Sequence, residues 1–389
     1  MLIEQKKNVY IIHTNNGETV LSMCIKAGSN QDKKGLCGTA HLCEHINLYL
    51  RHSTDDIFAQ NKFRFRGYTN FDHLVLKVFF PTNKKNLCLC EDYIKYTINT
   101  TEISNKIFTD SQREILDECF SLKKHWMEQM EIIRFLTDNK INKLPVGIPK
   151  EILKICSADI IEYIERYYYV QNISFIFETS LSMDMLEELM PWIFIKQESK
   201  KKIEINTDIK IGDVSILKSY NDKITKVDIN FELPFPINDI KTRLIVSAAE
   251  VLISDFISKS MSLDNKYIEI RERHLSVEDS YIVLSLSLET CEYCYEEIEE
   301  IIKMMIASLQ KQKLIKEEID EVKKMLLLSS KGELSREALF QMIFTEIYYK
   351  TPILLDSVYI SRSIKELKVD ELQSVYDKIV YGKCRIVCR

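Results

Sequence analysis

The sequence predicts an α+β protein built from two related lobes, and three observations lead to that class. The chain has 389 residues, whereas a single domain usually holds about 100 to 200. Segments with strand and helix periodicity alternate along the first half, and a similar order of segments recurs in the second half. We therefore expect two lobes, 1–185 and 205–389, each with its own core.

The composition is that of a globular protein. Hydrophobic residues make up 46% of the chain and charged residues 29%, which allows sizeable cores and excludes a fully disordered chain. The 53 basic and 58 acidic side chains leave a net charge of −5. We therefore expect no broad electrostatic contact with nucleic acid or with an anionic membrane.

The expected location is the cytoplasm. The first residues place a glutamate ahead of two lysines and then alternate in polarity, unlike a secretory signal. No apolar run approaches the roughly 20 residues that a membrane helix needs. The 11 cysteines are an odd number spread over both halves, which is typical of free thiols in a reducing compartment.

The first half should open with a hairpin. Extended segments at 9–13 and 19–27 flank Asn15-Asn16-Gly17, a turn sequence that supplies positive φ. Ser111 and Glu114 have capping-box spacing, which places the start of a long helix near Ser111. The other expected elements are helices at 38–49 and 86–98, a strand at 74–80, the long helix at 111–135, a loop at 144–149, a helix from 157 and a strand at 172–177.

The second half repeats this order. We expect strands at 213–220, 226–233 and 280–289, with helices at 244–257, 295–309 and 316–328. The end of each half matches most closely, because 157–161 leading into 173–177 resembles 368–372 leading into 384–388. A lone C-x-x-C at Cys291 and Cys294 is interpreted as the end of a strand and the start of a helix rather than a metal or redox site.

The chemistry is expected at 38–46, which reads GTAHLCEHI and contains H-x-x-E-H. His41 and His45 are four residues apart, so one helical turn places both imidazoles on the same face, separated by about 6 Å along the axis. Two imidazoles and a carboxylate can hold zinc with one position open, and Glu44 could accept a proton from water there. This inverted zinc-protease pattern predicts peptide hydrolysis. The alternative is a surface helix with incidental histidines.

These residues carry a family resemblance. Ala27-Gly28-Ser29 followed by the 38–45 motif resembles the signature of the pitrilysin and insulinase family, in the short-chain branch related to the mitochondrial processing peptidase. Residues 67–73 resemble the family's edge strand, 115–118 its glutamate-ligand helix and 144–152 its proline–glycine loop. The resemblance implies two related lobes, each an antiparallel-rich sheet packed with helices on one face, with the metal motif in the first lobe.

The resemblance also implies a metal site. His41, His45 and Glu118 would be the ligands of one zinc ion per chain, and Glu44 the general base.

The helix that carries Glu118 leaves other acids open as the third ligand. Asp117 points about 100° away from Glu118, whereas Glu114 shares its face one turn earlier. The family's supporting glutamate falls at Ser111 in this sequence, which departs from the family, so either Glu114 supports the site instead or the site is weaker than in its relatives.

The resemblance further implies that an extended peptide adds as a strand beside Arg66, Gly67, Tyr68 and Thr69. In the second lobe, the family has an arginine followed seven residues later by a tyrosine. Here the candidates are Arg271 or Arg273 with Tyr281, at spacings of ten (281 − 271) and eight (281 − 273). This helper pair is therefore either displaced or supplied by a partner subunit.

The expected function is a zinc-dependent metalloendopeptidase that cleaves unfolded peptides in a closed chamber. Since one chain supplies half of the family's usual chamber, we expect a homodimer or a heterodimer with a related subunit. The branch also suggests removal of a leader from a precursor peptide, as in bacteriocin maturation. The alternative is a non-catalytic or partner-dependent subunit of a heterodimeric peptidase that binds peptide.

Overall fold

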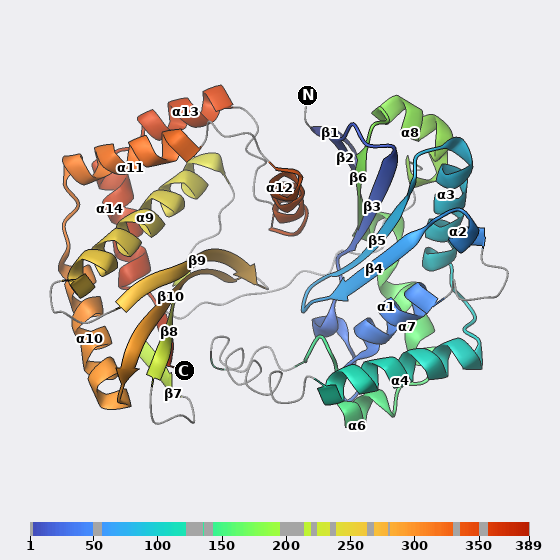
Figure 1. Ribbon diagram of the computed structural model, residues 1–389, viewed down its shortest axis with the longest axis horizontal. Coiled ribbons are helices and arrows are strands. Elements are labelled where there is room, and N and C mark those ends of the chain that lie inside the picture. Colours follow the sequence, from blue (N-terminus) through green and yellow to red (C-terminus); the bar gives the residue numbers. More distant parts are fainter. Residues whose placement is uncertain are drawn as a thin grey trace. The chain divides into compact units, whose positions relative to one another are not determined.

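A computed structural model describes residues 3–49, 57–121, 135, 143–194, 214–218, 224–233, 239–262, 268–278, 281–329, 335–349 and 357–388. The chain divides into two compact units, one formed by Met1–Ile203 with Arg336–Phe340 and the other by Glu204–Ser335 with Gln341–Arg389. Each unit contains one β-sheet with helices packed on one face (Figure 1). The predicted α+β class is confirmed.

The sheet of the first unit has the strand order β1-β2-β6-β3-β5-β4. Its strands are β1 (Ile3–Lys6), β2 (Val9–His13), β3 (Glu18–Ile25), β4 (Arg64–Thr69), β5 (Leu74–Pro81) and β6 (Ile173–Thr179). Only β2 and β6 pair in parallel, and the other neighbours are antiparallel. Strand β4 lies at the edge, where among the described strands it pairs with β5 alone.

Helices cover the sheet of the first unit, and the core lies between the two layers. The helices are η1 (Ser29–Gln31), α1 (Thr39–Tyr49), α2 (Ile57–Gln60), α3 (Lys84–Ile98), α4 (Asn105–Ser121), α6 (Pro149–Ile152), α7 (Ser157–Tyr167), η2 (Val170–Asn172), α8 (Met183–Leu189) and η3 (Pro191–Phe194). Leu21 and Phe177 of the sheet are fully buried and belong to the same core cluster as Leu42 and Ile46 of α1. Helix α1 packs on β4, α4 and α7, so its polar positions are held among fixed neighbours.

The second unit repeats this topology. Its strands are β7 (Val214–Lys218), β8 (Ile224–Leu233), β9 (Ile268–Glu278), β10 (Tyr281–Tyr293) and β11 (Cys384–Cys388). Their order, β7-β11-β8-β10-β9, matches β2-β6-β3-β5-β4 of the first unit, including the single parallel pair. The helices are α9 (Ile240–Ser262), α10 (Tyr295–Lys311), α11 (Lys316–Ser329), α12 (Arg336–Tyr349), α13 (Ser357–Lys365) and α14 (Val369–Val380). None of the described helices is long and apolar enough to cross a membrane.

The predicted opening hairpin is wrong. Strands β2 and β3 are not neighbours, because β6 lies between them and pairs with both. The first hairpin is instead β1–β2, closed by Lys7 and Asn8, and Lys7 has a φ of +56°. Asn15, Asn16 and Gly17 do not have positive φ. The local turn sequence gave no information about a strand that arrives from more than 150 residues later.

The predicted start of the long helix is also wrong. Helix α4 begins at Asn105, where the hydroxyl of Ser104 accepts a hydrogen bond from the amide of Ile107 at 3.3 Å. Ser111 therefore lies in the middle of the helix and is buried. The capping-box pattern was misleading because its two polar positions share one helical face of the same helix. The expected continuation to 135 falls largely outside the described residues.

The boundary at Cys294 agrees with the sequence interpretation. Strand β10 ends at Tyr293 and helix α10 begins at Tyr295, with Cys294 as its N-cap. Strands β1 and β9 were not expected from the sequence, nor were helices α12 and α13.

Candidate active site

The N-terminus of α1 is fixed by a buried carboxylate. Asp32 is 2% exposed and accepts hydrogen bonds from the backbone amides of Gly38 at 2.7 Å and Ala40 at 2.9 Å. These two amides belong to the first turn region, where a helix has no internal partners for them. The ammonium group of Lys143 bonds to the carbonyl of Asp32 and, at 2.7 Å, to that of Asn30. The start of the helix that carries the motif is therefore rigidly placed.

His41, His45 and Glu118 lie together, with one ligand atom from each within 4.8 Å of the others. Nε2 of His41 is 3.4 Å from Oε2 of Glu118, and Nε2 of His45 is 3.5 Å from Oε1 of the same carboxylate. Two ligands on a tetrahedral zinc ion, each about 2.0–2.1 Å from the metal, lie about 3.3 Å apart. The donor set and its spacing therefore fit a zinc ion.

The outer nitrogen of each imidazole has its own partner. Nδ1 of His41 lies 3.3 Å from the backbone carbonyl of Val146, and Nδ1 of His45 lies 3.1 Å from Oε2 of Glu114. Each partner accepts a hydrogen bond from an Nδ1–H group, which leaves the lone pair on Nε2 free for a metal. Of the two supporting residues considered from the sequence, Glu114 makes this contact. Ser111 does not, since its buried hydroxyl has no hydrogen-bond partner among the described residues.

The Val146 carbonyl is held in place by a tight backbone contact. Gly147 has a φ of +90°, and a Cβ atom there would lie 2.8 Å from Cα of Gly38. The amide of Ile148 donates to the carbonyl of Cys37 at 3.2 Å, which ties the loop to the start of α1. A bulkier residue at 147 would push the loop, and with it the Val146 carbonyl, away from His41.

Burial sets the charge state of the first histidine. Desolvation lowers the pKa of His41 to about 3, with a further contribution from His45, while the bond to Val146 opposes the shift. At neutral pH His41 is therefore uncharged, which is the state that coordinates a metal. The sequence motif alone gave the ligand type but not this electrostatic setting.

Glu44 lies beside the cluster and is 4% exposed. Its Oε2 accepts a hydrogen bond from the hydroxyl of Thr69 at 2.7 Å. A Cβ atom on Gly67 would come within 2.6 Å of Oε1, so the glycine makes room for the carboxylate. Burial raises the pKa of Glu44 to about 7, the nearby Glu118 adds to this shift, and the Thr69 bond opposes it. A carboxylate with a pKa near neutrality is suited to general base catalysis.

The four residues expected to bind peptide all lie on β4. Gly67 and Thr69 are on the side of the strand that faces Glu44, as the contacts above require. Arg66 and Tyr68 alternate with them, are exposed and lie on the opposite face. Because β4 is an edge strand, its outer backbone groups can pair with an added chain. The sequence did not reveal that Thr69 also bonds to Glu44.

The helper candidates of the second unit lie on a hairpin, of which only the backbone is described. Arg273 pairs with Leu286, and Arg271 falls at the bulge beside Ser287. Tyr281 pairs with Glu278 at the other end of the hairpin, five positions along β10 from Leu286. At about 3.3 Å per residue this separates Tyr281 from Arg273 by roughly 16 Å along the strand.

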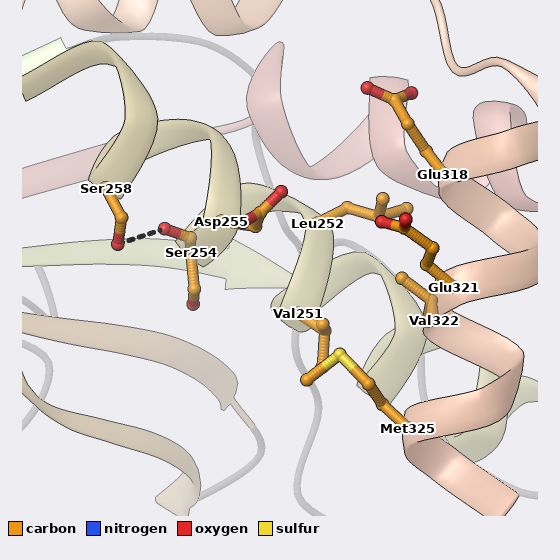
Figure 2. A pocket seen from close by; sticks show the side chains of 9 residues that line it. All are labelled: Val251, Leu252, Ser254, Asp255, Ser258, Glu318, Glu321, Val322 and Met325. Atoms are coloured by element: carbon orange, nitrogen blue, oxygen red, sulfur yellow. Dashed lines mark hydrogen bonds between the residues drawn. The ribbon is translucent and has the colours of Figure 1, made fainter. Parts of the chain in front are cut away.

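A separate cavity of about 290 Å³ lies in the second unit between α9 and α11 (Figure 2). Asp255, Glu318 and Glu321 contribute carboxylates to it, and apolar side chains form much of the remaining wall. Asp255 forms an ion pair with Lys259 at 2.5 Å. None of the nine lining residues is a histidine or cysteine. This cavity therefore offers carboxylates but no imidazole or thiolate to a zinc ion, whereas the first unit combines two imidazoles with a carboxylate.

A family model matches the first part of the chain. Residues 8–149 match the family model described as insulinase (peptidase family M16). This range includes the H-x-x-E-H motif and strand β4. The family resemblance predicted from the sequence is thus confirmed over these residues. A comparison with curated proteins finds no match.

Solved structures support the same fold over both units. The periplasmic protease PqqL from Escherichia coli is similar at 17% identity with a TM-score of 0.79, and the match covers 99% of this chain and 47% of PqqL. The first half of PqqL matches at 15% identity and a TM-score of 0.79, covering 99% and 91% of the two chains. A structure from Pseudomonas fluorescens described as an M16 inactive domain matches at 15% identity and a TM-score of 0.73, covering 99% and 96%. The chain therefore spans about half the length of full PqqL.

Proposed function

We propose that this chain, whose first lobe belongs to the insulinase family of peptidases (family M16), is a zinc-dependent endopeptidase that acts on unfolded peptides. The observation that carries the proposal is the convergence of His41, His45 and Glu118 beside the buried carboxylate of Glu44. The same family includes a structure described as inactive, so family membership alone is not the argument. In this chain, by contrast, His41, His45 and Glu118 converge as candidate ligands, and the carboxylate of Glu44 beside them is a candidate base.

Each residue has a defined task in this proposal. A zinc ion held by His41, His45 and Glu118 would polarise a peptide carbonyl and lower the pKa of a bound water to about 7. Glu44 accepts a proton at Oε1, because Oε2 is already bonded to the Thr69 hydroxyl. The free edge of β4 binds the peptide through backbone hydrogen bonds, which explains cleavage with loose sequence preference.

We further propose that the active form pairs this chain with a second copy or with a related subunit. The support is that the chain spans 47% of PqqL, so a protein of that size would need two such chains. One zinc ion per chain, a cytoplasmic location and precursor-peptide processing of the bacteriocin type belong to the same proposal.

The second candidate function is a peptide-binding subunit that is inactive without a partner. The hairpin register favours it, because Tyr281 is far along the strand from both Arg271 and Arg273. A chain without this helper pair would need a partner to stabilise the developing negative charge.

One substitution separates the two functions. Glu44→Gln keeps the shape of the side chain and all three ligands, so zinc stoichiometry should stay at the wild-type level. If the chain is a peptidase, cleavage of an unfolded peptide should fall by roughly 10²–10⁴-fold. If the purified wild-type chain is already inactive and only a co-expressed partner restores cleavage, the second function is supported. A wild-type chain that binds no zinc would contradict both.

A further inference from the structure

The face of β4 opposite Glu44 carries positive charge that no carboxylate among the described residues neutralises. This charge could add side-chain contacts to the backbone pairing proposed for the peptide. Arg66 is exposed on β4, and Lys77 lies directly opposite it on β5. Side chains at directly opposite positions are close neighbours, and like charges there destabilise the strand pair. Within the described parts of the chain, neither residue forms an ion pair with a carboxylate.

The neighbouring Arg64, unlike Arg66, is neutralised by an ion pair. Arg64 lies two residues before Arg66 on the same face and forms an ion pair with Glu18. Both guanidinium groups lie over the ring of Phe79, at 5.2 Å for Arg64 and 6.0 Å for Arg66. The ring holds the Arg66 side chain against the sheet but does not remove its charge.

Lys77 is half-buried, and its ammonium group lies 4.1 Å from the ring centre of Phe340. Residue 340 belongs to the short part of α12 that groups with the first unit. An aromatic ring stabilises a cation without neutralising it. Two positive charges therefore remain side by side next to the free edge of β4.

A chain added to that edge would place its side chains alternately on the two faces of the sheet. A peptide residue opposite Gly67 lies on the Glu44 side, where hydrolysis is proposed. The residue next to it lies on the other face, beside Arg66, at the distance where opposite charges on paired strands attract each other. That one peptide side chain would therefore interact electrostatically with Arg66 and, from the next strand, with Lys77.

We infer that the peptidase prefers substrates with an aspartate or glutamate adjacent to the residue that lies over Glu44, and that Arg66 is the specificity-determining residue. The inference rests on the proposed function, because it assumes that peptide pairs with β4. It adds a substrate class, namely acidic peptides, to a backbone contact that has no charge preference of its own.

The test uses three short internally quenched peptides that differ only in one central residue, glutamate, glutamine or lysine. Binding is measured by fluorescence anisotropy on the zinc-loaded Glu44→Gln chain, and cleavage on the zinc-loaded chain with Glu44 intact. We expect the glutamate peptide to bind roughly three- to tenfold more tightly than the lysine peptide, with the largest effect when the acid is adjacent to the cleaved bond. Arg66→Gln should abolish the preference and Arg66→Glu should reverse it. Higher salt should reduce the preference, since the Arg66 side chain is exposed.

The matched control is Arg166→Gln. It removes the same charge from an exposed position on α7, which belongs to the helical layer that packs on α1. The inference is supported if the preference for the glutamate peptide is lost in Arg66→Gln and retained in Arg166→Gln. Equal binding of all three peptides, or equal loss in both variants, overturns it.

The two readouts separate this inference from the proposed function. Charge-dependent binding without any cleavage would support the role of Arg66 and contradict hydrolysis by this chain. Cleavage without charge preference would support the peptidase and overturn the role of Arg66.

Discussion

Gly67 and Glu44 lie so close that no other residue fits at position 67 without moving the carboxylate. A Cβ atom on Gly67 would be 2.6 Å from Oε1, 2.7 Å from Cγ and 2.9 Å from Cδ of Glu44. Strand β4, the proposed peptide-binding strand, and helix α1 with the metal motif therefore meet at these two residues. In the proposed function, peptide binding and the position of the general base would therefore both depend on the backbone at Gly67.

We expect Gly67→Ala to reduce kcat by about 100-fold, because a displacement of the base by about 1 Å is enough for such a loss. Zinc stoichiometry should be unchanged, since the three atoms nearest the new methyl group all belong to Glu44 and none to a candidate ligand. Steady-state kinetics and metal analysis of the same preparation would measure both. The control is Gly17→Ala, where nothing lies within 4 Å of the added Cβ atom. Wild-type kcat in Gly67→Ala would show that Glu44 is not the base.

Helices with strong local signals were predictable, whereas sheet order was not. The helix at 39–49 and the motif on it follow from residues that are near one another in sequence. The position of β6 between β2 and β3 depends on pairing between residues that are 148 (173 − 25) to 166 (175 − 9) positions apart. A turn sequence such as Asn15-Asn16-Gly17 reports only local preference, and long-range pairing overrode it.

The candidate site also combines features that local sequence predicts with features that only the fold creates. The spacing of His41 and His45 predicts their shared face, and the structure places Glu118 beside them. The Val146 carbonyl and the Thr69 hydroxyl could not be found by pattern, since a backbone oxygen has no sequence signature and Thr69 is 25 residues from Glu44. These contacts are created by the fold and not by the motif.

Glu118 should be essential for metal binding, because its two oxygens face the two Nε2 atoms at 3.4 and 3.5 Å. We expect Glu118→Gln to weaken zinc binding by more than the about 10–100-fold that follows loss of an outer partner. Competition with a chromophoric chelator measures the zinc dissociation constant directly and does not depend on peptide cleavage.

Glu114→Gln is the graded control for that experiment. Glu114 bonds to Nδ1 of His45 at 3.1 Å and is not one of the three clustered ligands. Its amide variant should therefore weaken zinc binding by only about 10–100-fold. If the two variants bound zinc equally well, Glu118 would not be the third ligand.

Asp32 gives the first unit a distinctive pH dependence. Burial raises the pKa of Asp32 from 3.8 to about 7, although its bonds to the amides of Gly38 and Ala40 and the charge of Lys143 oppose the shift. The folded chain therefore binds this proton more tightly than the unfolded chain. The stability that the proton contributes is fully present below about pH 4 and is lost as the pH rises through about 7.

We expect the free energy of unfolding of the metal-free chain to carry a contribution from Asp32 that falls by up to about 1.4 kcal/mol per pH unit between about pH 4 and 7. Asp32→Asn cannot ionise, so this contribution should disappear. The variant should also be less stable by about 1–3 kcal/mol, because an amide nitrogen cannot accept the bond that a carboxylate oxygen accepts.

Urea unfolding followed by tryptophan fluorescence measures this effect in the relevant unit. The chain has two tryptophans, Trp126 and Trp192, and both fall within the first unit. Other buried carboxyl groups, such as Glu44, titrate in both proteins and cancel when Asp32→Asn is subtracted from wild type at each pH. The stability advantage of wild type should therefore shrink steadily from pH 5 to pH 7. An advantage that stays constant across this range would mean that Asp32 is already ionised in the folded chain, and that its bonds to the start of α1 outweigh the cost of burying its charge.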